Sequence, residues 1–214
     1  MNLYVNDTNV LYQKILVYSK MLILLAFIVI LLFLLPKYPK PEVLKDVVSK
    51  EEREHIIREA QTTLGPSTVS SDFNVDENVR KSETAWLSLD DPIVKSVCER
   101  CLKQTDRPLV NCEKLQVLRY KPGGYYLPHQ DVLKDVSNDR MYTFIVALND
   151  DYEGGETIFP NLNTSYKLDA GDVLFFHTVD NYNMMTSKAL HGGEPVKSGE
   201  KWICNLWVRK YSYN

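Results

Sequence analysis

The chain begins with a short polar tail, residues 1–14, which is followed by a long apolar block. Met21 to Leu35 is a run of fifteen residues without a polar side chain. As a helix, that run alone would span about 22 Å, short of the ~30 Å hydrocarbon core of a bilayer. Adding Ile15 to Lys20 extends the segment to 21 residues. We therefore expect residues 15–35 to form a single, uncleaved transmembrane anchor.

An apolar block of this length could also be a buried core helix or a cleaved signal peptide. A buried core helix should show a polar stripe, and this block has none. A cleaved signal peptide should end in small residues, whereas the sequence PKYPKPE follows here. Lysines lie on both sides of the block, at positions 14 and 20 before its core and 37 and 40 after it. Positive charge therefore does not fix the orientation in a membrane.

A proline-rich linker is expected over residues 36–45, and one domain over residues 46–214. The sequence Ser49-Lys50-Glu51-Glu52 has the spacing of a capping box and predicts a helix to about Leu64, ended by Gly65-Pro66. Residues 66–79 are expected to be a mobile polar loop. Asp90-Asp91-Pro92 then predicts the start of a second helix, with proline at its first position.

After about Asn111 the pattern changes to short runs of β-branched, aromatic and aliphatic residues. These runs are KLQVLRY, MYTFIVAL, ETIFP, DVLFF and KWICNLWV, and turn-forming Gly, Pro, Asp and Ser residues separate them. Helices first and strands afterwards predict an α+β domain in which helices cover one face of a β sandwich or barrel.

Composition excludes some functional classes. The net charge is −3 and the pI about 5.8, so no basic nucleic-acid footprint is expected. Four cysteines are too few for a disulfide scaffold. Cys98-x-x-Cys101 resembles half of a zinc or redox motif, but it lies on the apolar face of the second helix, and packing is the favoured interpretation. Whether Cys112 and Cys204 pair is left open.

Candidate chemistry concentrates at His129-Gln130-Asp131. Two residues apart on a strand point to the same face, so this His and Asp would share a face. One further histidine, His191, would complete a two-His, one-carboxylate set, which suits non-haem Fe(II). Lys201 follows ten residues after His191. The other interpretations are ordinary hydrogen-bonded histidines and a solvated lysine at a strand end.

Five motifs occur in a fixed order around these residues. They are RKSETAWL at 80–87, YKPGGYYLPHQD at 120–131, YEGGETIFP at 152–160, AGDVLFF at 170–176 and ALHGGEPVKSGEKWICNLWVR at 189–209. Together they resemble the prolyl 4-hydroxylase family of Fe(II)- and 2-oxoglutarate-dependent dioxygenases, from about residue 42 onward. The match is to the short, single-domain type of algae, plants and large viruses. The resemblance implies a double-stranded β-helix (jelly-roll) with flanking N-terminal helices.

The resemblance also implies roles for individual residues. His129, Asp131 and His191 match the iron ligands. Lys201 matches the lysine that pairs with the distal carboxylate of 2-oxoglutarate, Tyr120 matches a tyrosine that bonds the same carboxylate, and Thr157 is a third candidate contact. The residues expected on the peptide side are Arg140, Trp207, Glu113 and Tyr126.

The implied reaction is hydroxylation of peptidyl proline, with decarboxylation of 2-oxoglutarate to succinate and CO2. The expected cofactors and cosubstrates are Fe(II), 2-oxoglutarate, O2 and ascorbate, and the expected partner is a proline-rich peptide. The resemblance places such a domain in the endoplasmic reticulum lumen, held by the anchor. Two alternatives stay open: the same chemistry on another substrate such as peptidyl lysine, and an inactive membrane-tethered module that binds proline-rich peptides.

Overall fold

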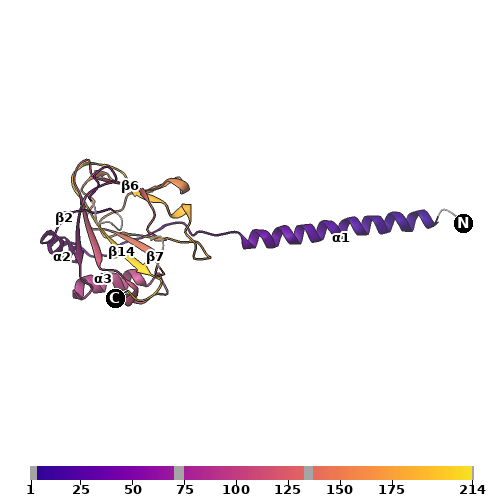
Figure 1. The fold of residues 1–214 in the computed structure, drawn as a ribbon, viewed down its shortest axis with the longest axis horizontal. Helices are drawn as coiled ribbons and strands as arrows, with labels where there is room; N and C mark the ends of the chain where they lie inside the picture. The colour runs from indigo at the N-terminus through magenta and orange to yellow at the C-terminus, as the bar shows by residue number, and fades with distance from the viewer. Residues whose placement is uncertain (1–3, 70–74, 133–136, 214) are drawn as a thin grey trace. The chain divides into compact units, whose positions relative to one another are not determined.

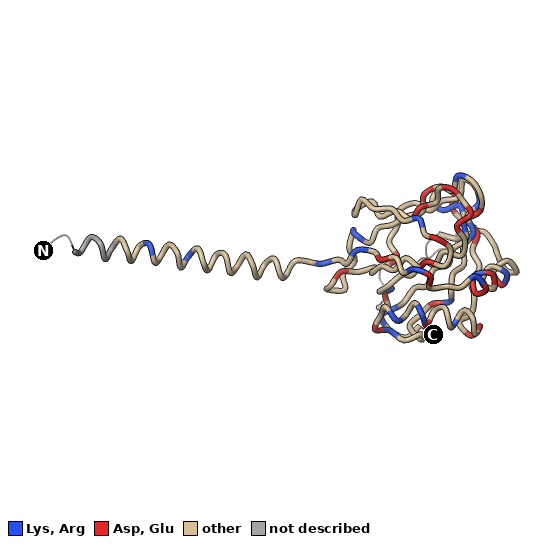
Figure 2. The backbone as a smooth tube through the Cα atoms, turned by 180° about the vertical axis from the view of Figure 1, so that it is seen from behind, with Lys and Arg blue, Asp and Glu red and all other residues tan. Residues whose placement is uncertain are grey.

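The computed structural model describes residues 4–69, 75–132 and 137–213, and the chain divides into two units, residues 1–37 and 38–214. The first unit is built on helix α1 (Tyr4–Leu34). Its segment Val10–Leu34 has a mean hydropathy of 2.8 and is long and apolar enough to cross a membrane, and none of that segment is buried. Within Val10–Leu34 the charged residues are Lys14 and Lys20, both basic (Figure 2).

The second unit begins with two helices whose ends follow the expected caps. Helix α2 (Lys50–Gln61) has the predicted capping box, because the Glu52 N–H donates to Ser49 Oγ and the Ser49 N–H donates to Glu52 Oε2. Helix α3 (Pro92–Leu102) starts at Pro92, and Asp91 Oδ1 accepts hydrogen bonds from the first free N–H groups. Both helix predictions are confirmed.

A seven-stranded antiparallel sheet forms the larger layer. In spatial order its strands are β1 (Glu42–Leu44), β11 (Val173–His177), β7 (Arg140–Ala147), β14 (Lys201–Arg209), β5 (Leu115–Tyr120), β4 (Glu83–Leu87) and β2 (Gly65–Pro66). Four of the five β-rich runs of the sequence become β5, β7, β11 and β14, and the fifth, ETIFP, becomes β9 of the smaller sheet.

The smaller layer is a five-stranded sheet of very short strands. They are, in spatial order, β10 (Thr164–Tyr166), β9 (Thr157–Phe159), β12 (His191–Gly193), β6 (Tyr125–His129) and β3 (Arg80–Lys81). A two-stranded ribbon joins β8 (Glu153–Gly154) to β13 (Val196–Ser198). Short 3-10 turns are found at η1 (Leu109–Asn111), η2 (Pro160–Leu162) and η3 (Ser187–Ala189).

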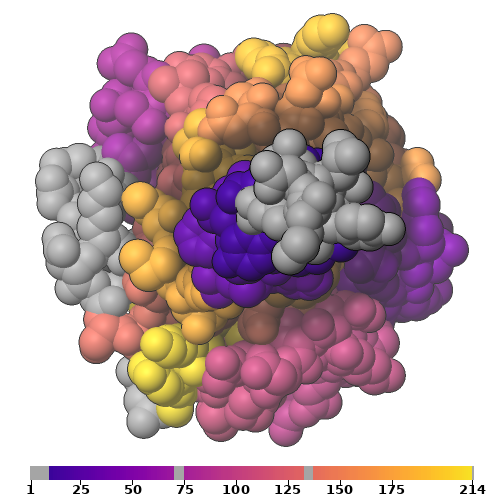
Figure 3. Space-filling view, turned by 90° about the vertical axis from the view of Figure 1, so that its right-hand side faces the viewer, coloured from indigo at the N-terminus to yellow at the C-terminus, as the bar shows by residue number. Residues whose placement is uncertain are grey.

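The larger sheet is buried on both faces, and β14 shows how. Cys204, Leu206 and Val208 face the core that α2 and α3 cover, whereas Ile203 belongs to a second core that includes Phe159 of the smaller sheet. In Figure 1, β7 and β14 accordingly lie between β6 on one side and α3 on the other. In Figure 3, segments coloured from purple through pink and orange to yellow share the visible face of this unit, so parts of the chain that are distant in sequence form one surface. The architecture is the expected jelly-roll with flanking helices.

The four cysteines lie in the helix-side core. Cys98, Cys101, Cys112 and Cys204 are all free and buried. Burial is the main cause that raises the pKa of the Cys101 and Cys112 thiols to about 12. The packing interpretation of the Cys98-x-x-Cys101 motif is therefore confirmed.

The structure differs from the expected boundaries in two places. Part of the linker expected at 36–45 belongs to the sheet, because β1 pairs with β11 and the Tyr38 hydroxyl donates to the His177 carbonyl. The second unit accordingly starts at Tyr38 rather than at residue 46. Gly65 and Pro66, expected only to end the helix, form β2 against β4. Within the loop expected at 66–79, residues 70–74 lie outside the described part of the chain.

Candidate active site

Two histidines far apart in the sequence are brought together by strand pairing. His129 is the last residue of β6 and His191 the first residue of β12, and the two are direct partners in the antiparallel register. Their imidazole centroids are 4.5 Å apart. The pairing of β6 with β12 therefore brings together two of the three residues of the predicted ligand set.

Asp131 reaches the same place by a different route from the one expected. The strand β6 ends at His129, so Asp131 lies in the bend beyond it, and the argument from strand alternation does not hold for this residue. Its carboxylate is held instead from the larger sheet, because Thr143 Oγ1 on β7 donates to Asp131 Oδ2 at 2.6 Å. This hydrogen bond, buried between the sheets, fixes the orientation of the carboxylate.

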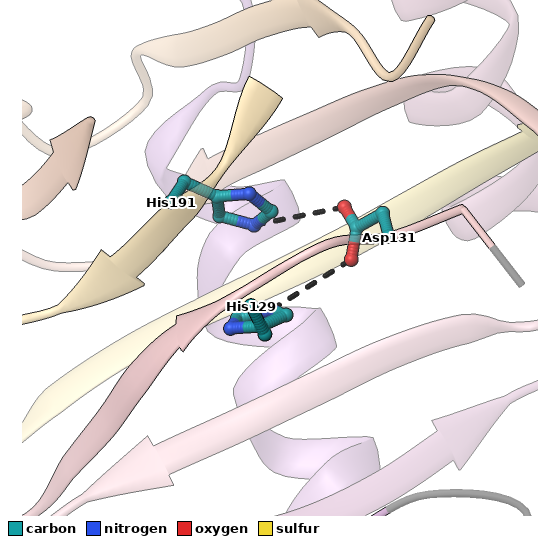
Figure 4. A group of neighbouring side chains, drawn as sticks. All are labelled: His129, Asp131 and His191. Carbon is teal, nitrogen blue, oxygen red and sulfur yellow. Dashed lines mark ion pairs between the residues drawn. The ribbon is translucent and has the colours of Figure 1, made fainter. Parts of the chain in front are cut away.

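The three side chains converge on one point (Figure 4). His129 Nε2 lies 3.8 Å from Asp131 Oδ1, and His191 Nε2 lies 3.6 Å from Asp131 Oδ2. One candidate ligand atom from each residue falls within 4.8 Å of the others. Among the described residues this is the one group of three or more His, Cys, Asp or Glu side chains arranged to hold a metal ion.

Hydrogen bonds to the backbone determine which imidazole nitrogen faces the carboxylate. His129 Nδ1 lies 2.9 Å from the Leu127 carbonyl, and His191 Nδ1 lies 3.0 Å from the Ala189 carbonyl. A carbonyl can only accept, so Nδ1 carries the proton in each ring and Nε2 keeps its lone pair. Such outer partners are typical of metal-binding histidines.

Electrostatics favour the ligand-ready charge states. Desolvation, with the neighbouring His191 as the second cause, lowers the pKa of His129 to about 3. Burial opposes ionisation of Asp131, but the imidazoles of His191 and His129 outweigh it and hold the pKa of the carboxyl below its usual value. At neutral pH the site therefore presents a neutral His129 imidazole beside a carboxylate.

The two histidines differ in how firmly they are packed. The His191 side chain is 5 % exposed and lies against the rings of Phe159 and Phe176, at centroid distances of 5.6 and 4.7 Å. The His129 side chain is 22 % exposed, and its aromatic contact besides His191 is the ring of Tyr126 at 3.7 Å.

A buried cation lies on the β14 side of the site. Lys201 pairs in register with Tyr120, and its Nζ lies 5.5 Å from the Tyr120 ring centroid. Nζ donates to the Gly155 carbonyl at 2.6 Å, and desolvation lowers the pKa of Lys201 to about 8. Among the described residues, no carboxylate lies within 4 Å of this ammonium group. Thr157 is buried as well, on β9.

The residues expected on the peptide side form two groups. Arg140 donates to both carboxylate oxygens of Glu113, at 2.6 and 2.9 Å, and its guanidinium lies 3.6 Å from the centroid of the Trp207 ring. Tyr126 is not in this cluster but stacks on His129. The structure thus brings together Arg140, Glu113 and Trp207, and places Tyr126 beside the histidines.

Several residues of the site were not predicted. Arg209 donates from Nε to Glu113 Oε1 at 2.9 Å, so that one carboxylate holds two guanidinium groups. Thr143 supports Asp131, and Trp86 contacts Trp207 with ring centroids 6.1 Å apart. Arg80 lies over the ring of Tyr126. Arg80 and Trp86 lie in the RKSETAWL motif. The sequence marked this motif as part of the family resemblance but gave no role to its residues.

Comparison with known proteins agrees with this geometry. Residues 115–209 match the family model of the 2OG-Fe(II) oxygenase superfamily. A protein of Acanthamoeba polyphaga mimivirus that carries a provisional prolyl 4-hydroxylase name is 37 % identical, over 83 % of this chain and 77 % of its own length. Prolyl 4-hydroxylase 1 of Arabidopsis thaliana is 33 % identical, over 80 % of this chain and 69 % of its own length.

A solved structure extends the similarity to the fold. The viral collagen prolyl hydroxylase of Paramecium bursaria Chlorella virus-1, in complex with 2-oxoglutarate, is 32 % identical with a TM-score of 0.67. The similarity covers 82 % of this chain and 97 % of that one. The two-His, one-carboxylate group, the jelly-roll and these relatives lead to one conclusion: the chain belongs to the prolyl 4-hydroxylase family of Fe(II)- and 2-oxoglutarate-dependent dioxygenases.

Proposed function

We propose that this protein hydroxylates proline residues of peptides at C4. In the same turnover, 2-oxoglutarate is decarboxylated to succinate and CO2. The observation that carries the proposal is the convergence of His129, Asp131 and His191 within 4.8 Å, in a unit that also buries the uncompensated ammonium of Lys201. Relatives named as prolyl 4-hydroxylases support it.

The residues present fit Fe(II) and 2-oxoglutarate. Two imidazoles and one carboxylate on a single face form the donor set of non-haem Fe(II) enzymes and leave coordination positions for other ligands. The Lys201 side chain is buried without a carboxylate partner among the described residues, although a desolvated ammonium normally requires an anion. A dicarboxylate such as 2-oxoglutarate supplies that anion.

We assign the individual steps to the residues as follows. His129, Asp131 and His191 hold the metal, and the Nδ1–carbonyl hydrogen bonds keep each Nε2 unprotonated. Lys201 pairs with the distal carboxylate of 2-oxoglutarate, while Tyr120 and Thr157 donate hydroxyl hydrogen bonds to it. Bound Fe(II) supplies the activation of O2, which inserts one oxygen atom into the keto acid as it loses CO2 and the other into the C–H bond of proline.

The peptide is selected by residues around the metal site. Oxidative chemistry attacks the C–H bond that is held nearest, so that selectivity depends on positioning. A proline-rich peptide in polyproline II form is ordered before it binds and fits grooves lined by aromatic residues. Trp207 and Tyr126 supply aromatic surface. Glu113 fixes the guanidinium of Arg140 over Trp207, so that its remaining N–H groups can donate to peptide carbonyls.

We further propose that residues 15–35 anchor the protein in a membrane and that residues 38–214 form the catalytic domain. Support comes from the length and apolar character of Val10–Leu34 and from the division of the chain after Lys37. An orientation toward the endoplasmic reticulum lumen would suit ascorbate-dependent maintenance of reduced iron. Acidic and basic residues are interspersed along the described backbone of this domain (Figure 2), and the net charge of the chain is −3, which gives no support for a nucleic-acid partner.

Release of labelled CO2 from 2-oxoglutarate, with and without peptide, tests the proposal. We expect release to rise with poly-proline or a Pro-Ala repeat, and mass spectrometry to show one added oxygen on proline. His129→Ala or His191→Ala should abolish release, whereas Arg140→Ala should reduce the peptide-dependent part far more than the uncoupled part. If a lysine-containing peptide gains oxygen and the proline peptides do not, the substrate is peptidyl lysine rather than peptidyl proline. Absence of any CO2 release would leave an inactive peptide-binding module.

A further inference from the structure

The most exposed metal-ligand candidate depends on a neighbour outside the ligand set. His191 is enclosed by two phenylalanine rings, but His129 is 22 % exposed and rests on Tyr126. We propose that Arg80 is a positioning residue for His129 and acts through Tyr126. This inference rests on the metal site of the proposed function but adds a residue to which that function gives no role.

Strand pairing places Arg80 against Tyr126. Arg80 on β3 is the register partner of Tyr126 on β6, and the Leu127 N–H donates to the Val79 carbonyl at 3.0 Å. The guanidinium carbon of Arg80 lies 4.6 Å from the centroid of the Tyr126 ring, and its Nε donates to Ser82 Oγ at 3.0 Å. The guanidinium is therefore held over the ring by Ser82, which follows directly after β3.

Burying the guanidinium of Arg80 costs free energy, which argues against an incidental contact with the Tyr126 ring. Its side chain is buried, with 6 % of the residue exposed, and Nη2 has no hydrogen-bond partner among the described residues. Burying an uncompensated cation is unfavourable, and loss of a hydrogen bond adds to that cost. The face of an aromatic ring attracts such a cation, and a planar, weakly hydrated guanidinium suits this contact better than an ammonium group does.

Tyr126 transmits this restraint to the metal ligand. Its ring lies 3.7 Å from the His129 imidazole centroid, with only 20° between the planes. The Nδ1–Leu127 hydrogen bond fixes which nitrogen faces the metal, while the stacked ring limits tilting of the imidazole. Loss of Arg80 would free the Tyr126 ring, and His129 would lose its restraint on the exposed side. Loss of an outer partner of a metal ligand typically costs about 10–100-fold in metal affinity.

Titration of the full chain in detergent with Co(II), in the absence of peptide and 2-oxoglutarate, tests the inference. The dissociation constant and the visible absorption bands of the bound ion report on the ligand geometry. We expect Arg80→Ala and Tyr126→Ala each to weaken Co(II) binding about 10–100-fold. Because Arg80 acts through the ring, the double variant should bind no more weakly than Tyr126→Ala alone.

Arg119 provides a matched control. It lies over the ring of Trp202 at 5.4 Å and pairs with Glu83 of the same RKSETAWL motif. Arg119→Ala therefore removes a comparable cation–ring contact and should leave the Co(II) affinity unchanged. Arg80→Lys, which keeps the charge but not the planar group, should fall between the wild type and Arg80→Ala, and it carries the test if the alanine variant does not fold.

The outcomes distinguish this inference from the proposed function. Equal Co(II) affinity in the wild type and the folded Arg80 variants would overturn the role of Arg80 while leaving the metal site in place. Additive losses in the double variant would show that Arg80 does not act through Tyr126. A wild-type chain that binds no Co(II) at all would remove the proposed metal site, and the inference with it.

Discussion

Buried cations around the site are compensated in three different ways. Arg140 is paired with both oxygens of Glu113, Arg80 lies over a ring, and Lys201 donates to a single backbone carbonyl. The first arrangement supplies a carboxylate, which Arg140 shares with Arg209. Lys201 is the cation that the proposed function pairs with a bound dicarboxylate, and its titration should be visible in cosubstrate binding.

Lys201→Ala should raise the concentration of 2-oxoglutarate needed for half-maximal turnover. A desolvated carboxylate that loses its charged partner costs about 3–5 kcal/mol, or roughly two to four orders of magnitude in affinity. Lys201→Arg should recover part of the loss, and Lys210→Ala, which removes a cation beside Tyr211, should have no effect. An unchanged Michaelis constant in Lys201→Ala would show that another cation holds the carboxylate.

Cosubstrate affinity should also depend on pH. Burial lowers the pKa of Lys201 to about 8 in the free protein, and 2-oxoglutarate binds the protonated form. Affinity should therefore be level below about pH 7 and fall as pH rises through 8, by up to about tenfold per unit. Isothermal titration between pH 6.5 and 9 measures this. The Lys201→Arg variant should show no such fall, because a guanidinium stays protonated throughout.

The sequence predicts some residues of the site and not others, and the difference depends on which contacts position each side chain. His129, His191 and Lys201 lie in motifs that the sequence marks, and strand register then fixes their positions, since His129 pairs with His191 and Lys201 with Tyr120. Arg80 and Arg209 lie in motifs of the sequence, but their contacts, like that of Thr143, join segments distant in sequence, and no local pattern reveals such contacts. Asp131 belongs to the candidate metal-binding group although it lies in a bend beyond the strand, so strand alternation does not account for its position.

At the scale of whole elements, some helices and strands are marked by their own sequence, and others form only through pairing with a neighbour. The helices α2 and α3 were predictable because their first turns carry capping side chains, and β5, β7, β11 and β14 because each is a long apolar run. The strands β3, β8, β12 and β13 have two or three residues each, often glycine. They form only because a partner strand is present, and therefore no periodicity revealed them.

The edge strand β1 gives a prediction about where the domain begins. A chain that starts at residue 46 lacks β1 and loses the ion pair between Lys45 and Asp172. It also exposes β11 as a new apolar edge, which favours aggregation. We expect it to be less stable than a chain starting at Tyr38 by roughly 2–4 kcal/mol, from the partly buried Val43 and Leu44. Chemical denaturation compares the two, and equal midpoints would show that β1 contributes nothing.

The cap of α3 gives a second prediction at this scale. Asp91 Oδ1 accepts from two backbone N–H groups, and Oδ2 lies 2.8 Å from His55 Nε2 on α2. Asp91→Ala should therefore cost about 1–2 kcal/mol of unfolding free energy. Asp90→Ala is the matched control, because among the described residues that carboxylate accepts a hydrogen bond from the nearby Ser88 alone.

The stability difference for Asp91 should change with pH. Burial opposes ionisation, but the backbone N–H groups and His55 outweigh it and lower the pKa of the Asp91 carboxyl below 3.8. The stabilisation is therefore complete above the unfolded-state pKa and is lost as pH falls through the lower, folded-state value. Thermal unfolding at pH 7 and below pH 3 should show the difference between Asp91→Ala and the wild type shrinking in acid.

At the scale of the whole molecule, the two units lead to a prediction about topology. If the anchor leaves residues 38–214 in the lumen, Asn163-Thr164-Ser165 becomes available for glycosylation. Asn163 is exposed in a left-handed turn, with φ of 52°. Expression with sealed microsomes should then give a protease-protected domain, and Asn163→Gln should remove a glycan-sized mass. Digestion of the domain from the outside would place it in the cytosol.

The hydrogen bond from Thr143 to Asp131 has a consequence for local unfolding. His129 and His191 belong to the smaller sheet, while Asp131 is fastened through Thr143 to β7 of the larger one. A bound ion would therefore link the larger sheet to the smaller one, whose strands have only two to five residues each. An ion that binds only when the two sheets are in place lowers the population of locally unfolded states in which the site is open. Amide exchange in β6, β9 and β12 should slow when Fe(II) or Co(II) is added under anaerobic conditions, while exchange in β5 and β14 changes little. In Thr143→Val, which lacks the hydrogen bond to Asp131, the ion should still bind. The slowing of amide exchange that it causes should no longer extend across the junction between the two sheets.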